Sequence, residues 1–218
     1  MQINFKQIKH NITHSPNRKI EYIILHDTGN FKQGANAEMH FKYFNGGNRQ
    51  SSADFFVDDS QVLKINDYKN NFTWAVGDGK GRYGITNRNS ISVEICVNSD
   101  NDMDKTINKT IDLVIYLMKE LNLPIERVCR HFNASRKNCP QTMNMGTWDK
   151  WHAFINQVKE RMNPMKKIEN VDEALKVLVE NGVINSPDYW KTASNMVKYF
   201  DLFILNVANK LNEMKGVK

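Results

Sequence analysis

Short runs of apolar residues alternate with polar turns through the first part of the chain, and several have the length of strands. The run KIEYIIL at Lys19–Leu25 is apolar on both faces and ends at His26, which predicts a central strand buried on two sides. Ser90–Val97, SISVEICV, alternates instead, and this places Glu94 on the face opposite the aliphatic residues. Ser52–Ile65 predicts two short strands around an Asp-Asp-Ser turn.

Apolar residues recur every three or four positions in other segments, a spacing that predicts amphipathic helices. Those predicted helices are Gly34–Phe44, Asp104–Leu121 and Trp148–Met162. Pro124–Val128 is interpreted as a connector. Because strands and helices are mixed throughout residues 1–162, we expect one α/β domain with a central mixed β-sheet flanked by helices.

The pattern changes at residues 163–169, a polar segment with Pro164 that predicts a linker. Residues 170–218 then predict a small all-α C-terminal domain. Asn170 is a plausible N-cap, Gly182 is a natural stop, and Ser186-Pro187 favours a second helix start. We expect two or three short helices here, with a break near Asp201.

Composition places the chain among folded globular proteins, with 218 residues, 40% of them hydrophobic and 25% charged. No window has the run of apolar residues that a membrane span needs. The first ten residues lack the apolar region of a secretory signal peptide, so we expect synthesis in the cytoplasm. Three cysteines make a disulfide framework unexpected in a chain of this size.

The formal net charge of +6 is mildly basic. The lysines and arginines are scattered rather than clustered with aromatic residues, so the sequence does not favour a nucleic-acid-binding protein. The same charge suits an anionic polymer surface such as a bacterial cell wall. Charge alone does not choose between these partners.

Candidate chemistry is concentrated in RHFNASRKNCP, Arg130–Pro140, which we expect to be a loop. His131 and Cys139 fit no common zinc-finger spacing, but a polar loop allows their side chains to converge. Catalytic zinc requires three protein ligands, and His26 at the end of a buried strand is a candidate for the third. Spacing alone leaves open whether these residues are ligands or ordinary loop residues.

Two charged residues have both a structural and a chemical interpretation. Glu94 lies within a strand, where a carboxylate is costly unless it is paired, so it is either the partner of a buried cation or a general base near a metal. Lys137 is either a solvated loop lysine or a positive charge beside a developing oxyanion. We interpret the remaining histidines as structural or surface residues: His10, His14, His40 and His152.

Taken together, the motifs resemble the amidase-2 type of zinc-dependent N-acetylmuramoyl-L-alanine amidase, a type that includes phage endolysins and bacterial autolysins. The resemblance covers about residues 1–160 and rests on the order of IEYIILHDTGN, GANAEMHF, SSADFFVDDS, WAVGDG, ITNRNSISVEICVN and RHFNASRKNCP. It implies that His26, His131 and Cys139 bind Zn²⁺, that Glu94 is the catalytic acid/base, and that Lys137 stabilises the tetrahedral intermediate. Some relatives carry a tyrosine where this chain has SADF, so no hydroxyl from that strand is given a role.

The resemblance also implies a substrate, the amide between N-acetylmuramic acid and L-alanine in peptidoglycan. From their positions near the motifs, Asn30, Trp74, Asn87 and Arg88 are predicted to line the groove, although Trp74 also suits a packing role. We expect a phage or prophage endolysin that reaches the wall after release or lysis. The alternative is a non-catalytic peptidoglycan-binding protein, which predicts a missing metal ligand.

The C-terminal helices carry no cluster of ligands or paired carboxylates. They are expected either to bind the cell wall or to form a homodimer. For wall binding, the candidate sugar-stacking residues are Tyr189, Trp190 and Tyr199, of which Trp190 also falls on the apolar stripe of the predicted helix.

Overall fold

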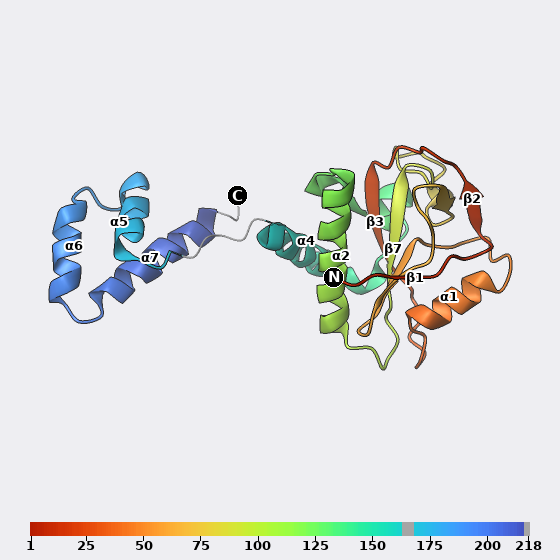
Figure 1. The fold of residues 1–218 in the computed structure, drawn as a ribbon, viewed down its shortest axis with the longest axis horizontal. Helices are drawn as coiled ribbons and strands as arrows, with labels where there is room; N and C mark the ends of the chain where they lie inside the picture. Colours follow the sequence, from red (N-terminus) through yellow and green to blue (C-terminus); the bar gives the residue numbers. More distant parts are fainter. Residues whose placement is uncertain (163–167, 216–218) are drawn as a thin grey trace. The chain divides into compact units, whose positions relative to one another are not determined.

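The computed structural model describes residues 1–162 and 168–215. The chain divides into two compact units, Met1–Lys159 and Glu160–Lys218, which are considered separately below (Figure 1). Within the described residues, no helix is both long and apolar enough to pass through a bilayer.

A six-stranded mixed sheet forms the centre of the first unit. Its strands, in spatial order, are β1 (Asn4–Phe5), β5 (Val62–Lys64), β4 (Phe55–Val57), β7 (Ser90–Ile95), β3 (Tyr22–Asp27) and β8 (Val128–Arg130). The four strands from β4 to β8 run parallel, and β5 pairs antiparallel with β4. A separate antiparallel pair joins β2 (Ile12–His14) to β6 (Asn71–Thr73). The predicted central mixed sheet is confirmed.

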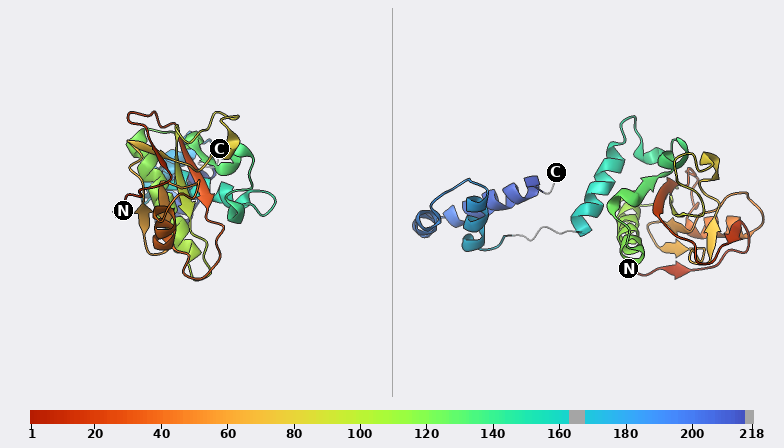
Figure 2. Two further views of the ribbon diagram at one scale, coloured as in Figure 1. Left: turned by 90° about the vertical axis from the view of Figure 1, so that its right-hand side faces the viewer. Right: turned by 90° about the horizontal axis from the view of Figure 1, so that it is seen from above.

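Helices cover both faces of this sheet (Figures 1 and 2). The α-helices are α1 (Ala37–Asn45), α2 (Met103–Leu121), α3 (His131–Ser135) and α4 (Asp149–Met162). Short 3-10 turns are η1 (Gly77–Gly79), η2 (Ile125–Arg127) and η3 (Gln141–Met143). Helix α1 closes one face by packing Ala37, Phe41 and Phe44 against Phe56 of β4, and α2 lies on the opposite side of the sheet.

Several predicted boundaries were wrong for identifiable reasons. The strand predicted at Lys19 begins at Tyr22, because the preceding residues are polar or half exposed. The connector at Pro124–Val128 is instead η2 followed by β8, a three-residue strand too short to leave a periodic signal. Part of the expected loop at Arg130–Pro140 is α3, whose first residue is His131.

The second unit is a three-helix assembly of α5 (Val171–Glu180), α6 (Pro187–Met196) and α7 (Phe200–Lys215). Asn170 caps α5 as predicted, because its side chain accepts the Glu173 backbone N–H at 2.8 Å. The chain breaks at residues 197–199 rather than near Asp201, which lies in the first turn of α7.

The predicted linker at residues 163–169 falls mostly outside the described residues. Ile168, by contrast, belongs to the core of the helical unit, where it packs with Ala174, Leu175, Leu178, Ile204 and Ala208. Its backbone is held by Asn209 of α7, whose amide accepts the Ile168 N–H at 2.9 Å and donates to the Ile168 carbonyl at 3.0 Å.

Replacing Asn209 with alanine is expected to loosen the entry into α5. The change removes both hydrogen bonds and should lower the free energy of local opening at the start of α5 by about 1–2 kcal/mol. Hydrogen exchange of peptides covering residues 168–178 in the full chain measures the effect. Asn206→Ala, an exposed position on the same helix, is the matched control, and equal protection in the two variants would contradict the assignment.

Candidate metal centre and active site

Three neighbouring parallel strands bring the candidate site residues to one edge of the sheet. His26 of β3 and Glu94 of β7 are paired residues, so their side chains leave the sheet on the same face. On the other side of β3, Leu25 is paired with Arg130 of β8, and His131 therefore follows next to His26. Functional groups in α/β sheets commonly gather at the carboxyl ends of parallel strands, as they do here.

His26, His131 and Cys139 form a buried cluster. One potential ligand atom from each lies within 4.8 Å of the others. The imidazole rings of the two histidines have centroids 4.6 Å apart, and Cys139 Sγ lies 3.8 Å from His26 Nδ1. These residues lie up to 113 positions apart in the chain, so it is the fold that assembles the cluster.

The chemistry of these donors fits a zinc ion. Burial lowers the pKa of both histidines, with nearby positive charge adding to the effect on His26, so both rings are neutral and free to act as ligands. His26 Nε2 is buried without a hydrogen-bond partner among the described residues. Two neutral imidazoles and one cysteine sulfur are three protein ligands of the kind that catalytic zinc sites use, with a fourth position left for water or substrate.

Burial also raises the pKa of the Cys139 thiol to about 12, with the Glu94 carboxylate contributing. A metal cation would displace this proton, because the thiolate is the form that binds. The backbone N–H of Asp27 already donates a hydrogen bond to the sulfur, which favours the thiolate.

Asp78 fixes the orientation of His131. Its carboxylate lies 2.9 Å from His131 Nε2, which leaves Nδ1 as the nitrogen facing the cluster. Asp78 lies in η1, and η1 packs directly against α3: a Cβ on Gly79 would lie 2.2 Å from the Ala134 carbonyl oxygen. Only glycine at position 79 permits this approach, and Asp78 is thereby brought to the histidine.

Asp27 holds the segment that carries Cys139. Its Oδ2 accepts hydrogen bonds from the backbone N–H and the hydroxyl of Thr142, at 2.6 and 2.8 Å. Thr142 lies in η3, just after the cysteine. Asp27 therefore ties the end of β3 to the Cys139 loop. Neither aspartate was predicted from the sequence to have a role, although each lies within one of the motifs, HDTGN or WAVGDG.

Glu94 lies beside the cluster with one carboxylate oxygen, Oε2, buried and without a partner among the described residues. Burial raises its pKa to about 8, and the nearby Asp27 carboxylate adds to this, while Lys137 opposes it. Among the described residues, no arginine or lysine forms an ion pair with it. The structural interpretation of Glu94 as the partner of a buried cation is therefore not supported.

Lys137 is exposed, and its charge acts on the whole site. It lowers the pKa of His26 and His131 and opposes the upward shifts at Glu94 and Cys139. These four effects on pKa place the charge of Lys137 near all four groups. The structure therefore brings together the five residues predicted for metal binding and catalysis.

The four residues predicted to line the groove lie in different surroundings. Asn30 borders a cavity that also includes Glu94. Trp74 lies away from it, with its indole N–H donated to Thr13 at 2.9 Å, and the Asn87 side chain accepts the backbone N–H groups of Ala75 and Val76. Arg88 is exposed on the loop after Asn87, and its backbone carbonyl accepts a hydrogen bond from Arg18.

Comparison with known proteins agrees with this geometry. A family profile described as N-acetylmuramoyl-L-alanine amidase, of the amidase-2 type, matches residues 16–142. This range includes every member of the cluster together with Glu94 and Lys137. The chain belongs to the amidase-2 family.

Curated relatives in the family have the same activity in their names. The chain is 38% identical to the N-acetylmuramoyl-L-alanine amidase CwlH of Bacillus subtilis, over 67% of this chain and 56% of that protein. It is 36% identical to XlyA of the same organism, over 62% of this chain and 43% of that protein. The chain thus spans about half the length of the curated relatives it matches.

Solved structures of this family confirm the predicted fold. A mutant endolysin from Bacillus subtilis superposes with a TM-score of 0.63 at 32% identity, covering 72% of this chain and 98% of that chain. The catalytic domain of XlyA gives a TM-score of 0.62 at 32% identity, covering 71% of this chain and 99% of that one.

Asp78→Asn is expected to weaken zinc binding about 10- to 100-fold, because the amide no longer fixes the ring of His131 as a carboxylate does. Competition with a chromophoric chelator measures the dissociation constant. The matched control is Asp104→Asn on α2, which should bind zinc like the unaltered chain. Unchanged affinity in Asp78→Asn would show that the 2.9 Å contact does not position the ligand.

Proposed function

We propose that this chain hydrolyses the amide between N-acetylmuramic acid and L-alanine in peptidoglycan, in the manner of an endolysin. The observation that carries the proposal is the buried His26, His131 and Cys139 cluster beside Glu94. The names of its amidase relatives support the same reaction.

In this proposal His26, His131 and Cys139 hold a zinc ion. When bound, the ion supplies Lewis acidity to the amide carbonyl and acidity to a water molecule. With one thiolate and two neutral imidazoles, the centre keeps a net charge of +1.

Glu94 moves the proton. It accepts a proton from the attacking water and donates it to the departing nitrogen of L-alanine. Burial and the Asp27 carboxylate raise the pKa of Glu94 to about 8 in the metal-free chain, and a cation bound beside it would lower that pKa toward neutrality, where one group serves as both base and acid. Lys137 places its charge beside the oxyanion that forms on the former carbonyl oxygen.

The runner-up is a non-catalytic peptidoglycan-binding protein that uses the same groove. Such a protein has no need of a complete ligand set or of a buried carboxylate beside it. All three ligand types and Glu94 are present here, which favours the enzyme.

Incubation with purified cell walls should release new L-alanine amino termini, and a chelator should abolish the release. Glu94→Gln should lower the rate by at least about 100-fold while the zinc content stays near one ion per chain, since the amide cannot transfer the proton. Lys137→Met should also lower the rate without loss of zinc. Intact walls that nonetheless retain the unaltered protein would favour the binding module instead.

For the helical unit we propose cell-wall binding through exposed aromatic residues. Tyr189 and Tyr199 are each 67% exposed, and Tyr199 is followed in α7 by the exposed Leu202 and Phe203. Exposed apolar groups this close together favour an interaction surface. Trp190 is less suited to sugar stacking, because it packs into the helical core and stacks on Phe200.

Co-sedimentation with cell walls tests this proposal in the Glu94→Gln background, where the wall stays intact. Replacing both Tyr189 and Tyr199 with alanine should reduce the bound fraction about tenfold, with little change in folding because both side chains are exposed. The matched control is Trp190→Phe, which should retain binding. If the double variant binds walls normally but changes from dimer to monomer in sedimentation velocity, the surface serves a homodimer.

A further inference from the structure

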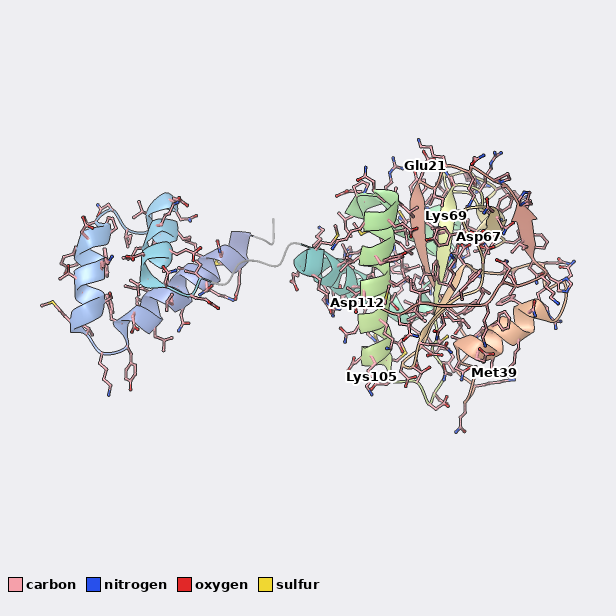
Figure 3. The ribbon with its side chains drawn as sticks, viewed as in Figure 1. Glu21, Met39, Asp67, Lys69, Lys105 and Asp112 are labelled. Atoms are coloured by element: carbon pink, nitrogen blue, oxygen red, sulfur yellow. The ribbon has the colours of Figure 1, made fainter. Side chains whose placement is uncertain are left out.

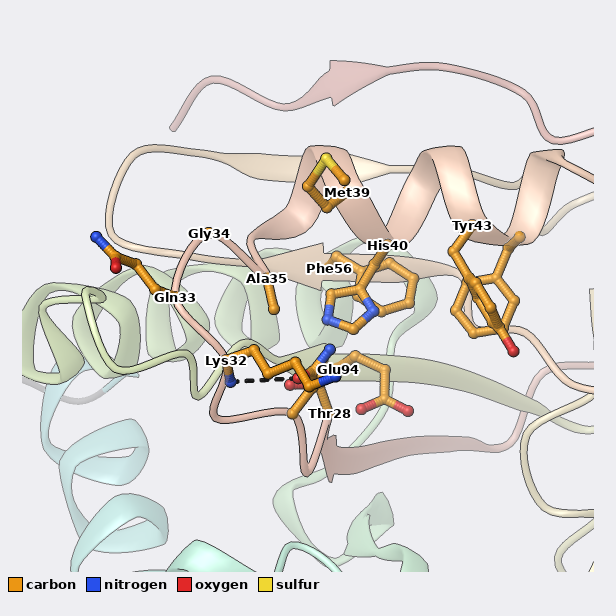
Figure 4. Close-up of a pocket in the computed structure, with 12 residues that line it drawn as sticks. Thr28, Lys32, Gln33, Gly34, Ala35, Met39, His40, Tyr43, Phe56 and Glu94 are labelled. Carbon is orange, nitrogen blue, oxygen red and sulfur yellow. Dashed lines mark hydrogen bonds between the residues drawn. The ribbon is translucent and has the colours of Figure 1, made fainter.

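A cavity of about 450 Å³ opens beside Glu94, between the loop that follows β3 and helix α1 (Figure 4). Apolar side chains, including Phe56, Phe44 and Met39, form much of its wall. Thr28, His40 and Glu94 supply polar groups to the same space. Sequence analysis assigned His40 no chemical role.

Three buried polar atoms around this cavity have no hydrogen-bond partner in the part of the chain that the structure describes. They are Thr28 Oγ1, His40 Nε2 and Glu94 Oε2. A buried polar atom without a partner costs free energy, so each such atom requires an explanation. Their presence around one cavity indicates that a polar ligand satisfies them.

The imidazole of His40 is fixed in both position and tautomer. It stacks on Phe56 with ring centroids 5.0 Å apart and planes within 6° of each other. The ring also donates a hydrogen bond to the backbone of Ala35, and since Nε2 has no partner, the donor is Nδ1. Burial lowers the pKa of His40, so the ring is neutral and Nε2 is an acceptor. The cavity therefore calls for an N–H donor at this point.

The chemistry of the reaction indicates which part of the substrate enters. Glu94 has to reach the departing nitrogen of L-alanine to protonate it. The groups attached to that nitrogen then extend into the space that Glu94 borders. This space consequently receives the leaving group, which is the stem peptide.

We propose that His40 Nε2 accepts a hydrogen bond from the peptide N–H that joins L-alanine to the second stem residue, with the Thr28 hydroxyl bound to the same peptide. The inference rests on the proposed function and makes His40 a specificity-determining residue of the site. Glu94 protonates the scissile nitrogen, and the next N–H donor along the stem is this amide.

The alternative occupant, a stem carboxylate, fits poorly against His40 itself; Lys32, which also lines the cavity, is the group that would pair with one. A carboxylate offers only acceptors, and a neutral Nε2 is also an acceptor, so the two repel. The apolar wall strengthens the preference, because a hydrogen bond shielded from water contributes more than an exposed one.

The test compares two synthetic substrates, GlcNAc-MurNAc carrying L-Ala-D-isoGln-L-Lys and its depsipeptide, in which an ester oxygen replaces the second N–H. Each is measured as a substrate and as a competitor of wall hydrolysis. The unaltered chain should prefer the amide about 10- to 100-fold in kcat/KM, because the ester leaves Nε2 unpaired. His40→Phe, which keeps a ring on Phe56 but has no acceptor, should prefer the amide less than about twofold.

His40→Gln carries an acceptor and should restore part of the preference. Thermal unfolding and zinc content of both variants separate recognition from loss of fold. A His40→Phe enzyme that keeps the full amide preference overturns the inference. So does a His40→Phe enzyme whose kcat/KM falls equally on the amide and on the ester. Failure of the proposed function is a different result: the unaltered, zinc-loaded chain then releases no L-alanine termini from cell walls.

Discussion

The parallel pairing of β7, β3 and β8 is the constraint on which the site depends. It fixes His26 beside Glu94 and brings His131 to the next position across the sheet. Side chains alternate between the two faces of a strand, so a slip of one residue in β7 would turn Glu94 away from the proposed metal ligands. The aliphatic residues on the other face of β7 are fully buried and oppose that slip, since it would remove them from the core on their own face, and the hydrophobic core therefore enforces the register of the proposed catalytic groups.

The site at the end of these strands contains buried polar atoms without a hydrogen-bond partner among the described residues. Exposed charges on the unit form ion pairs instead: Lys105 pairs with Asp102, Lys69 with Glu120, and Glu21 with Lys19. Figure 3 labels Lys105, Lys69 and Glu21. Such exposed pairs contribute little to stability and tolerate change. At the site, Glu94 and His26 instead keep a buried atom without a partner among the described residues. A ligand bound at the site would offset this destabilising arrangement.

The sequence predicted the long periodic elements and the five central site residues, but for different reasons. Helix α2 and strand β7 have strong periodicity, and their ends were predicted within two residues. The ligand set came from resemblance, because no local rule connects His26 to Cys139 across 113 positions. Asp78 was missed because its contact with His131 joins residues 53 positions apart in the sequence. The groove position predicted for Asn87 stays a prediction, and the structure adds that its side chain also holds the loop at Ala75 and Val76.

The proposed metal ligands are held from two directions. Asp78 reaches His131 from η1, while Asp27 anchors the Cys139 loop through Thr142. The two supports share no residue. Metal binding then closes a cluster whose histidines are already neutral and oriented, and little of the binding free energy is spent on ordering the chain. The Cys139 proton remains the main obstacle, since burial raises the pKa of that thiol, and metal affinity should accordingly rise with pH.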